Sequence, residues 1–218
     1  MKKVLITGAT GMVGSLILDQ CLSASEVSQI FVLGRRPLGV NHPKLSETIV
    51  SDFTDYSAQS DAFQDIDIAF FCIGVYTGQV SDAEFATITI DYAVAFAKAL
   101  KQHSPQATLC FLSGAGADRT GKSNMAFAKY KGVAEREIAE MNLNAFYVFR
   151  PAYIYPVEKR KEPNIGYSII RMLYPFIRLF GNNASIKSTE LASGMVHAGL
   201  HGAKQEILEN RDILELII

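Results

Sequence analysis

The strongest constraint on the fold is the alternation of short apolar runs with longer helical patterns over the first 150 residues. Several runs are apolar without a break, which is typical of strands that are covered on both faces. Strands that alternate with helices predict an α/β fold, a doubly wound parallel sheet of Rossmann type. The predicted strands are residues 4–7, 30–34, 48–51, 66–74, 108–113 and 145–150, and the predicted helices are 12–22, 82–101 and 125–141.

The pattern changes after Arg150 and Pro151, where a polar loop is followed by an apolar segment at 167–180, a final helix and a short strand. A chain of 218 residues can bury one sizeable core. We therefore expect a single domain over 1–218, in which residues 151–218 contribute a small substrate cap at the carboxyl edge of the sheet.

The charges are nearly balanced, with 21 basic and 22 acidic side chains and a net charge of −1. This balance argues against a nucleic-acid-binding protein, which needs a basic surface. The three cysteines form no CxxC pair, which favours a reducing compartment. The first apolar run is too short for a signal peptide, and 167–180 is too short and too charged for a membrane span. These features predict a cytoplasmic protein.

A glycine-rich loop, Thr7 to Gly14, lies between the first predicted strand and the first predicted helix. Gly8 permits a tight turn, Gly11 allows the backbone to approach a pyrophosphate, and Gly14 allows the helix to pack closely on the strand. The context predicts a dinucleotide site, although a purely structural turn is the alternative. The cofactor-binding residues expected in this loop are Gly8, Thr10, Gly11, Met12, Val13 and Gly14.

Cofactor preference is predicted by the residues that follow the second strand. An acidic residue there would hold the ribose of NAD, but this chain has Arg35 and Arg36. Two guanidinium groups can bind the 2′-phosphate of NADP, so NADP(H) is the preferred cofactor and NAD remains possible. The alternative is that both arginines are ordinary solvated side chains.

Further cofactor contacts are expected where the next two strands end. Asp52 and Phe53 follow the third strand and are candidates for adenine contacts. Cys72, Ile73 and Gly74 end the fourth strand, where small residues would let a dinucleotide pass. Cys72 also has a simpler interpretation as an inert thiol in an apolar strand.

These motifs, together with Ser113 to Asp118, Lys131-Gly132 and Arg150-Pro151, resemble the atypical short-chain dehydrogenase/reductases, and in particular their Tat-interacting-protein-like NADP(H)-binding branch. The resemblance implies that Ser113 polarises a substrate carbonyl and that Lys131 holds the nicotinamide ribose. The residues after the sixth strand, Pro151 and Tyr153, are then expected to complete the cofactor pocket.

One position departs from that family. A tyrosine four residues before the lysine is its usual proton donor, but Phe127 occupies this position and has no proton to give. Tyr130 is the substitute on the same predicted helix, although a purely structural role suits its angular position better. Tyr153 and Tyr155 are further candidates, so the proton donor stays open.

Two functions are consistent with these residues. The first is an NADP(H)-dependent oxidoreductase or epimerase-like enzyme that acts on a small carbonyl or alcohol, with Ser113, Lys131 and Tyr130 as catalytic candidates. The alternative is a non-catalytic NADP(H)-binding regulatory or redox-sensing protein. A homodimer or a protein partner is possible in either case. His197 and His201 have the spacing of a metal pair but lack a third ligand, so we expect no metal site.

Overall fold

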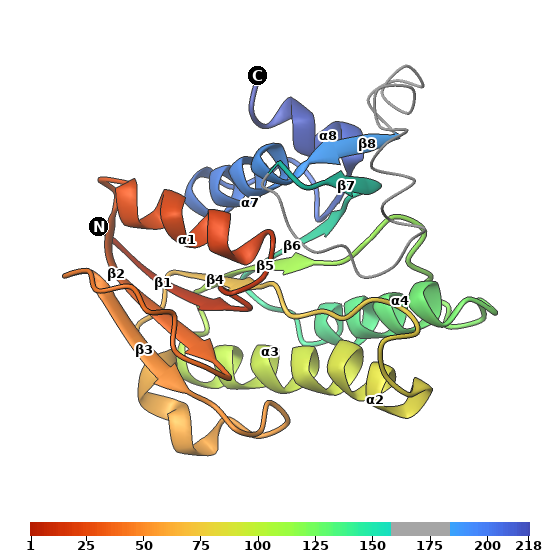
Figure 1. Cartoon of the computed structure of the whole chain (residues 1–218), viewed down its shortest axis with the longest axis horizontal. Coiled ribbons are helices and arrows are strands. Elements are labelled where there is room, and N and C mark those ends of the chain that lie inside the picture. The colour runs from red at the N-terminus through yellow and green to blue at the C-terminus, as the bar shows by residue number, and fades with distance from the viewer. Residues whose placement is uncertain (158–183) are drawn as a thin grey trace.

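The computed structural model describes residues 1–157 and 184–218. Its centre is a seven-stranded sheet in which every neighbouring pair is parallel (Figure 1). The strand order is β3-β2-β1-β4-β5-β6-β9, so the connections reverse direction between β1 and β4. In open α/β sheets this reversal opens a crevice at the carboxyl ends of the strands. The strands are β1 (Lys2–Thr7), β2 (Val27–Gly34), β3 (Leu45–Ile49), β4 (Ile68–Phe71), β5 (Thr108–Leu112), β6 (Ala145–Arg150) and β9 (Ile207–Glu209).

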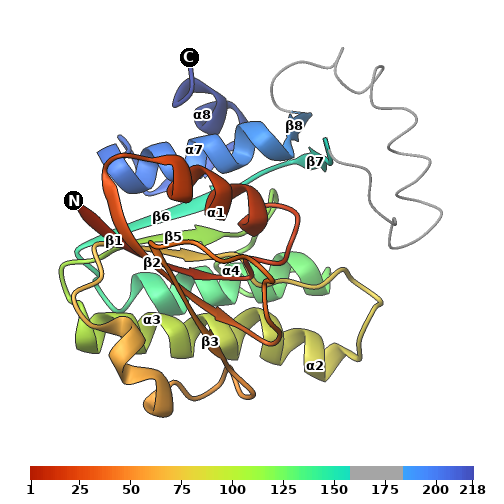
Figure 2. The same cartoon turned by 60° about the vertical axis from the view of Figure 1, so that its left-hand side comes forward.

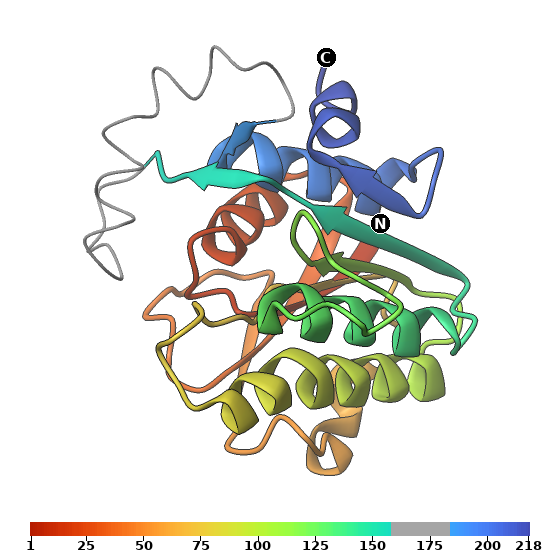
Figure 3. The same cartoon turned by 90° about the vertical axis from the view of Figure 1, so that its right-hand side faces the viewer.

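Helices cover both faces of this sheet, as Figures 2 and 3 show. One face carries α1 (Gly14–Ser23) and α7 (Ser188–His201), which pack against each other. The other face carries α3 (Tyr92–His103) and α4 (Ala126–Ala139), with a 3₁₀ segment at Ser57–Phe63 beside α3. The predicted α/β class and doubly wound parallel sheet are therefore confirmed.

The unbroken apolar runs follow from this layering. In β1, Val4 and Ile6 belong to the core cluster under α1 and α7, whereas Leu5 belongs to the cluster under α3 and α4. In β4, Ile68 and Phe70 face the first cluster, while the residues between and after them face the second. Because successive side chains point to opposite faces, a strand covered on both sides must be apolar throughout.

The predicted helix at 82–101 is interrupted. The structure has a short helix α2 (Asp82–Ala86), a π-helical turn at Thr87–Asp91 and then α3. The hydroxyl of Ser81 accepts a hydrogen bond from the Glu84 backbone N–H at 3.2 Å, and this bond caps the start of α2. The apolar pattern continues through the π turn, so the interruption has no obvious signature in the sequence.

The tail beyond residue 150 was expected to form a small cap, and the structure shows that it also supplies a helix and a strand to the main core. The helix α7 packs on α1, β9 extends the main sheet beside β6, and α8 (Asn210–Glu215) follows directly. A separate two-stranded parallel sheet, β7 (Tyr153–Tyr155) with β8 (Ser185–Lys187), lies beyond the carboxyl end of β6 (Figure 2).

Two sequence features of the tail, the basic loop 159–161 and the apolar segment 167–180, lie outside the described residues. Within residues 1–157 and 184–218, no helix is long and apolar enough to cross a membrane.

Candidate functional site

The glycine-rich loop forms a tight turn that a side chain would disrupt. Gly8 has φ = +76°, and a Cβ atom there would lie 2.6 Å from the carbonyl carbon and oxygen of Cys72. A Cβ atom on Gly14 would lie 2.2 Å from the Gly8 carbonyl oxygen. The Gly11 backbone N–H donates to the same oxygen at 2.9 Å. The start of α1 is thus held directly against the end of β1, which is the packing that a phosphate-binding helix N-terminus needs.

A pocket of about 380 Å³ lies beside this loop, at the carboxyl ends of β1, β4, β5 and β6. It joins three predicted groups, namely the glycine loop, the end of β4 and the Ser113–Lys131 pair. Among the predicted residues, those that line the pocket are Gly11, Met12, Val13, Cys72, Ile73, Gly74, Ser113, Lys131, Pro151 and Tyr153. Lining residues that the sequence analysis did not single out as cofactor contacts include Val75, Tyr76, Thr77, Gly114 and Ile154.

Lys131 is a buried cation on the pocket wall. Its side chain extends from α4, and Nζ donates a hydrogen bond to the Leu112 carbonyl oxygen at 2.8 Å. The same Nζ lies 5.0 Å from the centre of the Phe111 ring. Burial lowers the pKa of Lys131 to about 8, while the nearby Glu135 and Cys72 act in the opposite direction.

Ser113 is part of a buried ion-pair network. Its hydroxyl donates to Glu135 Oε1 at 2.5 Å, and Glu135 is fully buried. Arg119 Nε donates to Glu135 Oε2 at 3.0 Å, and Arg150 Nη2 donates to the same oxygen at 2.5 Å. Arg150 also pairs with Glu209 on β9 at 3.3 Å. The network therefore ties β5, α4, β6 and β9 together at the edge of the pocket.

Phe127 stands in the pocket where the resemblance implies a tyrosine. Its ring lies directly over Gly114, because a Cβ atom on that glycine would be 2.4 Å from Phe127 Cζ. The aromatic ring, Ser113 and Lys131 all line the same cavity. Phe127 therefore lies on the wall of this pocket, and its side chain presents carbon atoms alone.

The structure does not bring Tyr130 to this pocket. Its hydroxyl donates to Asp82 Oδ2 at 2.6 Å, and its ring packs edge-on against Phe85 with the ring centres 5.7 Å apart. Both partners belong to α2, so the tyrosine faces a different neighbour from Lys131. Three residues along a helix turn a side chain by about 300°, which leaves Tyr130 about 60° to one side of Phe127, whereas Lys131 lies about 40° to the other side.

The predicted adenine-end residues lie outside the pocket. Arg35 and Arg36 follow β2 and are exposed. Asp52 is also exposed, and its carboxylate accepts hydrogen bonds from the backbone N–H and the hydroxyl of Thr54, which lower the pKa of Asp52. Phe53 is buried in the core and stacks on Tyr92 at 5.4 Å, so its side chain is not available for an adenine contact. Thr10 is exposed at the tip of the glycine loop.

Cys72 is half-buried in the pocket wall, whereas Cys110 is fully buried. Burial raises the pKa of the Cys72 thiol to about 12, so this thiol is unreactive at neutral pH. The rings of His197 and His201 contact each other with centres 4.8 Å apart. Across the described parts of the chain, no group of three or more histidine, cysteine or acidic side chains is arranged to hold a metal ion.

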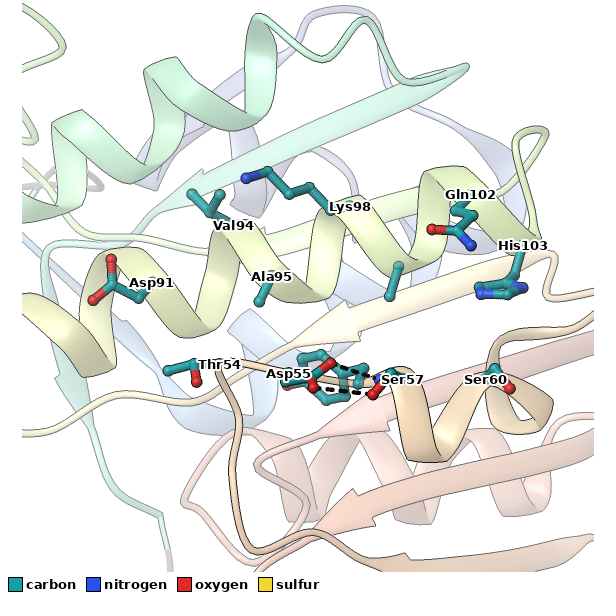
Figure 4. Close-up of a pocket in the computed structure, with 12 residues that line it drawn as sticks. Thr54, Asp55, Ser57, Ser60, Asp91, Val94, Ala95, Lys98, Gln102 and His103 are labelled. Atoms are coloured by element: carbon teal, nitrogen blue, oxygen red, sulfur yellow. Dashed lines mark hydrogen bonds between the residues drawn. The ribbon is translucent and has the colours of Figure 1, made fainter.

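A second hollow of about 530 Å³ lies on the other side of the fold, between α3 and residues 54–60. Figure 4 shows that α3 contributes Lys98 and His103 to its lining, that Asp91 lies just before this helix, and that the facing segment contributes Asp55 and Ser57. Asp55 accepts hydrogen bonds from the backbone N–H and the hydroxyl of Ser57, so its carboxylate serves the local turn. This hollow contains none of the residues predicted from the sequence.

Comparison with known proteins places the fold and the pocket in a family. The NAD dependent epimerase/dehydratase family matches residues 4–142, well over half of the chain. The chain belongs to this family. The epimerase/dehydratase match covers the glycine loop, Ser113 and Lys131, so the residues that line most of the pocket lie within the shared region.

Individual relatives of this epimerase/dehydratase member extend over nearly the whole chain. Protein HTATIP2 of Rattus norvegicus is 25% identical over 99% of this chain and 89% of its own length. Protein FMP52, mitochondrial, of Chaetomium globosum is 26% identical over 99% of this chain and 97% of its own length. Because this relative is named as a mitochondrial protein, the cytoplasmic location of the present chain stays a prediction.

The solved structure of Gre2 from Candida albicans, a complex with NADPH, has a similar fold. The TM-score is 0.73 at 15% identity, and the match covers 95% of this chain and 77% of that chain. This likeness confirms the Rossmann-type architecture. The family match and the fold therefore agree on an epimerase/dehydratase with a Rossmann-type sheet.

Proposed function

We propose that this protein binds NADP(H) across the carboxyl ends of β1 and β4 and transfers hydride between the nicotinamide and a small carbonyl compound or alcohol. One observation carries the proposal, namely that the loop residues Gly11 to Val13 and the buried Lys131 line a single pocket. The loop suits the pyrophosphate and the lysine suits the nicotinamide ribose, so two neighbouring parts of a nicotinamide dinucleotide have matching partners.

The residues fit the cofactor at several points. The N-terminus of α1, which begins at Gly14, carries the positive end of the helix dipole and so suits a phosphate, while the Ser15 and Ile17 N–H groups already donate to the loop carbonyls of Gly11 and Val13. A Cβ atom added to Gly74 would meet no other atom within 4 Å, which leaves open space for a ligand beside the end of β4. Lys131 can donate to ribose hydroxyl groups. Arg35 and Arg36 follow β2, where their positive charges can bind the 2′-phosphate that NADP(H) has and NAD(H) lacks.

The bound cofactor supplies the hydride, and the chain supplies placement and electrostatics. The substrate side of the pocket is formed by residues after β6, namely Pro151, Tyr153 and Ile154. Apolar side chains such as Phe127 and Leu112 line the same cavity. A pocket of about 380 Å³ with these walls suits a small, partly apolar substrate next to the nicotinamide.

A second candidate is a regulator that binds NADP(H) without turnover. Phe127 favours it, because a dinucleotide can bind to this fold without the missing tyrosine hydroxyl. In that case the cofactor would change the affinity for a protein partner or for a second copy of the chain. Association that depends on whether NADPH or NADP⁺ is bound would support the regulator.

The deciding experiment combines binding with turnover. NADPH binding is measured by nucleotide fluorescence, and NADPH oxidation is followed across aldehydes, ketones, quinones and nucleotide sugars, with Phe127→Tyr tested in parallel. We expect the wild type to bind NADPH and to oxidise it with at least one of these classes. If both proteins bind NADPH but only Phe127→Tyr oxidises it, the result favours the regulator. If the wild type does not bind NADPH, both functions are contradicted.

A further inference from the structure

A carbonyl reduction in this pocket needs a proton as well as a hydride. Three side chains near the expected position of the donor cannot supply this proton, and Tyr130, a candidate from the sequence, is one of them. Phe127 has no acidic proton, the hydroxyl of Ser113 directs its hydrogen into Glu135, and the hydroxyl of Tyr130 donates to Asp82 outside the pocket. The pocket wall also carries Lys131, Tyr76 and Tyr153. Among these three, Lys131 lies on the same helix, α4, as Phe127.

Lys131 has the position and the hydrogen-bonding capacity for this role. It is 7% exposed and lines the same cavity as Phe127 and Ser113. The Leu112 carbonyl oxygen accepts one hydrogen bond from Nζ, whereas an ammonium group has three N–H donors. The bond to Leu112 and the contact with the Phe111 ring also hold Nζ at a fixed place.

We propose that Lys131 is the proton donor of this pocket, in addition to its contact with the cofactor ribose. The proposal rests on the proposed function. The carbonyl carbon accepts a hydride from the reduced nicotinamide, and the carbonyl oxygen takes one proton from the Lys131 ammonium. The products are an alcohol, the oxidised cofactor and a neutral amine, which regains its proton from water. In the oxidation direction, the neutral amine takes the proton from the alcohol.

The electrostatic surroundings agree with this assignment. Burial lowers the pKa of Lys131 to about 8, so the side chain is charged at neutral pH but releases its proton more readily than an exposed lysine. The groups around it are Glu135 one turn further along α4 and Cys72 at the end of β4. Arg119 and Arg150 neutralise Glu135 by direct ion pairs, which limits its ability to hold the proton on Lys131.

The first test needs no substrate. Trace acetylation with acetic anhydride over pH 6–11, read by fragment-ion mass spectrometry, compares Lys131 with the exposed Lys129 two residues earlier on the same helix. We expect the reactivity of Lys131 to reach half of its maximum near pH 8, and we expect NADPH to protect Lys131 but not Lys129. Parallel titration of the two lysines would contradict the proposal.

The second test uses a substrate class found in the panel. Lys131→Arg keeps the positive charge but has a group that does not give up its proton near neutral pH. We expect its Kd for NADPH to stay within about threefold and its kcat to fall by about 100-fold or more, as for loss of a general acid. Adding Phe127→Tyr to Lys131→Arg supplies a new acid and should restore part of kcat. Lys129→Arg is the matched control and should behave as the wild type.

The outcomes separate this proposal from the proposed function. If Tyr153→Phe abolishes kcat while Lys131→Arg retains it, Lys131 is not the donor although the hydride transfer stands. Turnover that appears after Phe127→Tyr but not in the wild type would also overturn the role of Lys131. If NADPH binds but no variant oxidises it, both the hydride transfer and the Lys131 assignment are wrong.

Discussion

The hydroxyl of Ser113 donates a 2.5 Å hydrogen bond to Glu135, a carboxylate that has no exposed surface. An ionised carboxylate only accepts hydrogen bonds, so the Ser113 hydrogen must point toward it. The lone pairs of the Ser113 oxygen then remain for a donor in the pocket, such as a hydroxyl or amide group. In this arrangement the Ser113 oxygen can accept a hydrogen bond from a ligand donor, whereas the family resemblance implies that its hydroxyl polarises a carbonyl.

Removing the charge of Glu135 should destabilise the protein strongly. Glu135→Gln removes the buried negative charge that Arg119 and Arg150 share and replaces one carboxylate oxygen with an NH2 donor, so we expect a loss of about 2–4 kcal/mol in the free energy of unfolding. Urea unfolding followed by circular dichroism measures this loss. Glu140→Gln removes an exposed partner of Arg136 at the end of the same helix and should cost less than about 1 kcal/mol. Equal effects of the two variants would contradict the assigned network.

A methyl group at Gly14 should damage both folding and cofactor binding. In Gly14→Ala the new Cβ would lie 2.2 Å from the Gly8 carbonyl oxygen, so the glycine loop must move away from α1. We expect NADPH affinity to fall by about tenfold or more, because the phosphate-binding N–H groups lose their arrangement. Gly34→Ala is a useful comparison, since its nearest atom would be 3.5 Å away. Unchanged NADPH affinity in Gly14→Ala would argue against the loop as the binding element.

The arginines after β2 should determine the choice between NADPH and NADH. Arg35→Ala with Arg36→Ala is expected to weaken NADPH binding by about tenfold or more, because charge-assisted bonds to a phosphate are lost. The affinity for NADH, which lacks the 2′-phosphate, should change little. Titration with both nucleotides measures the ratio, and Arg211→Ala on the distant helix α8 serves as a control. Equal NADPH and NADH affinities in the wild type would refute the predicted preference.

Lys131 should make stability depend on pH in the alkaline range. Its pKa is about 8 in the folded protein and near 10.5 when unfolded, so the unfolded chain binds more protons between these values. Stability therefore rises with pH in this window. Relative to Lys131→Met, the wild type should gain about 2 kcal/mol between pH 8 and pH 10. Urea midpoints of both proteins over this range provide the measurement, and a constant difference would show that the pKa of Lys131 is not lowered.

Much of the fold was predictable because parallel strands and glycine turns leave strong local signals. The run at 145–150 coincides with β6, and the loop from Thr7 to Gly14 is placed as its glycines require. The final helix and short strand predicted for the tail correspond to α7 and β9. The sequence did not predict that α7 packs on α1 or that β9 joins the main sheet beside β6, because both depend on tertiary contacts. The π turn in the predicted helix 82–101 likewise depends on tertiary packing.

The candidate site was only partly predictable. The sequence predicted many of the residues that line the pocket, but it did not single out Glu135. Charged residues usually mark the solvent-facing side of a helix, whereas the buried face of α4 contains both Lys131 and Glu135. Their spacing of four residues places them on one face and was the available signal. The direction of Tyr130 depended on its partner Asp82, 48 residues earlier, which no local pattern identifies.

The packing of α1 against α7 has a consequence for the order of folding. The helix α1 begins at Gly14, whereas the helix that covers it begins at Ser188 and the last strand of the sheet begins at Ile207. Apolar side chains of α1, including Ile17 and Leu18, are therefore buried in part by residues that lie far away in the sequence. Contacts of this kind must close a long loop before they contribute stability, so we expect the α1–α7 contact to form late and to slow folding.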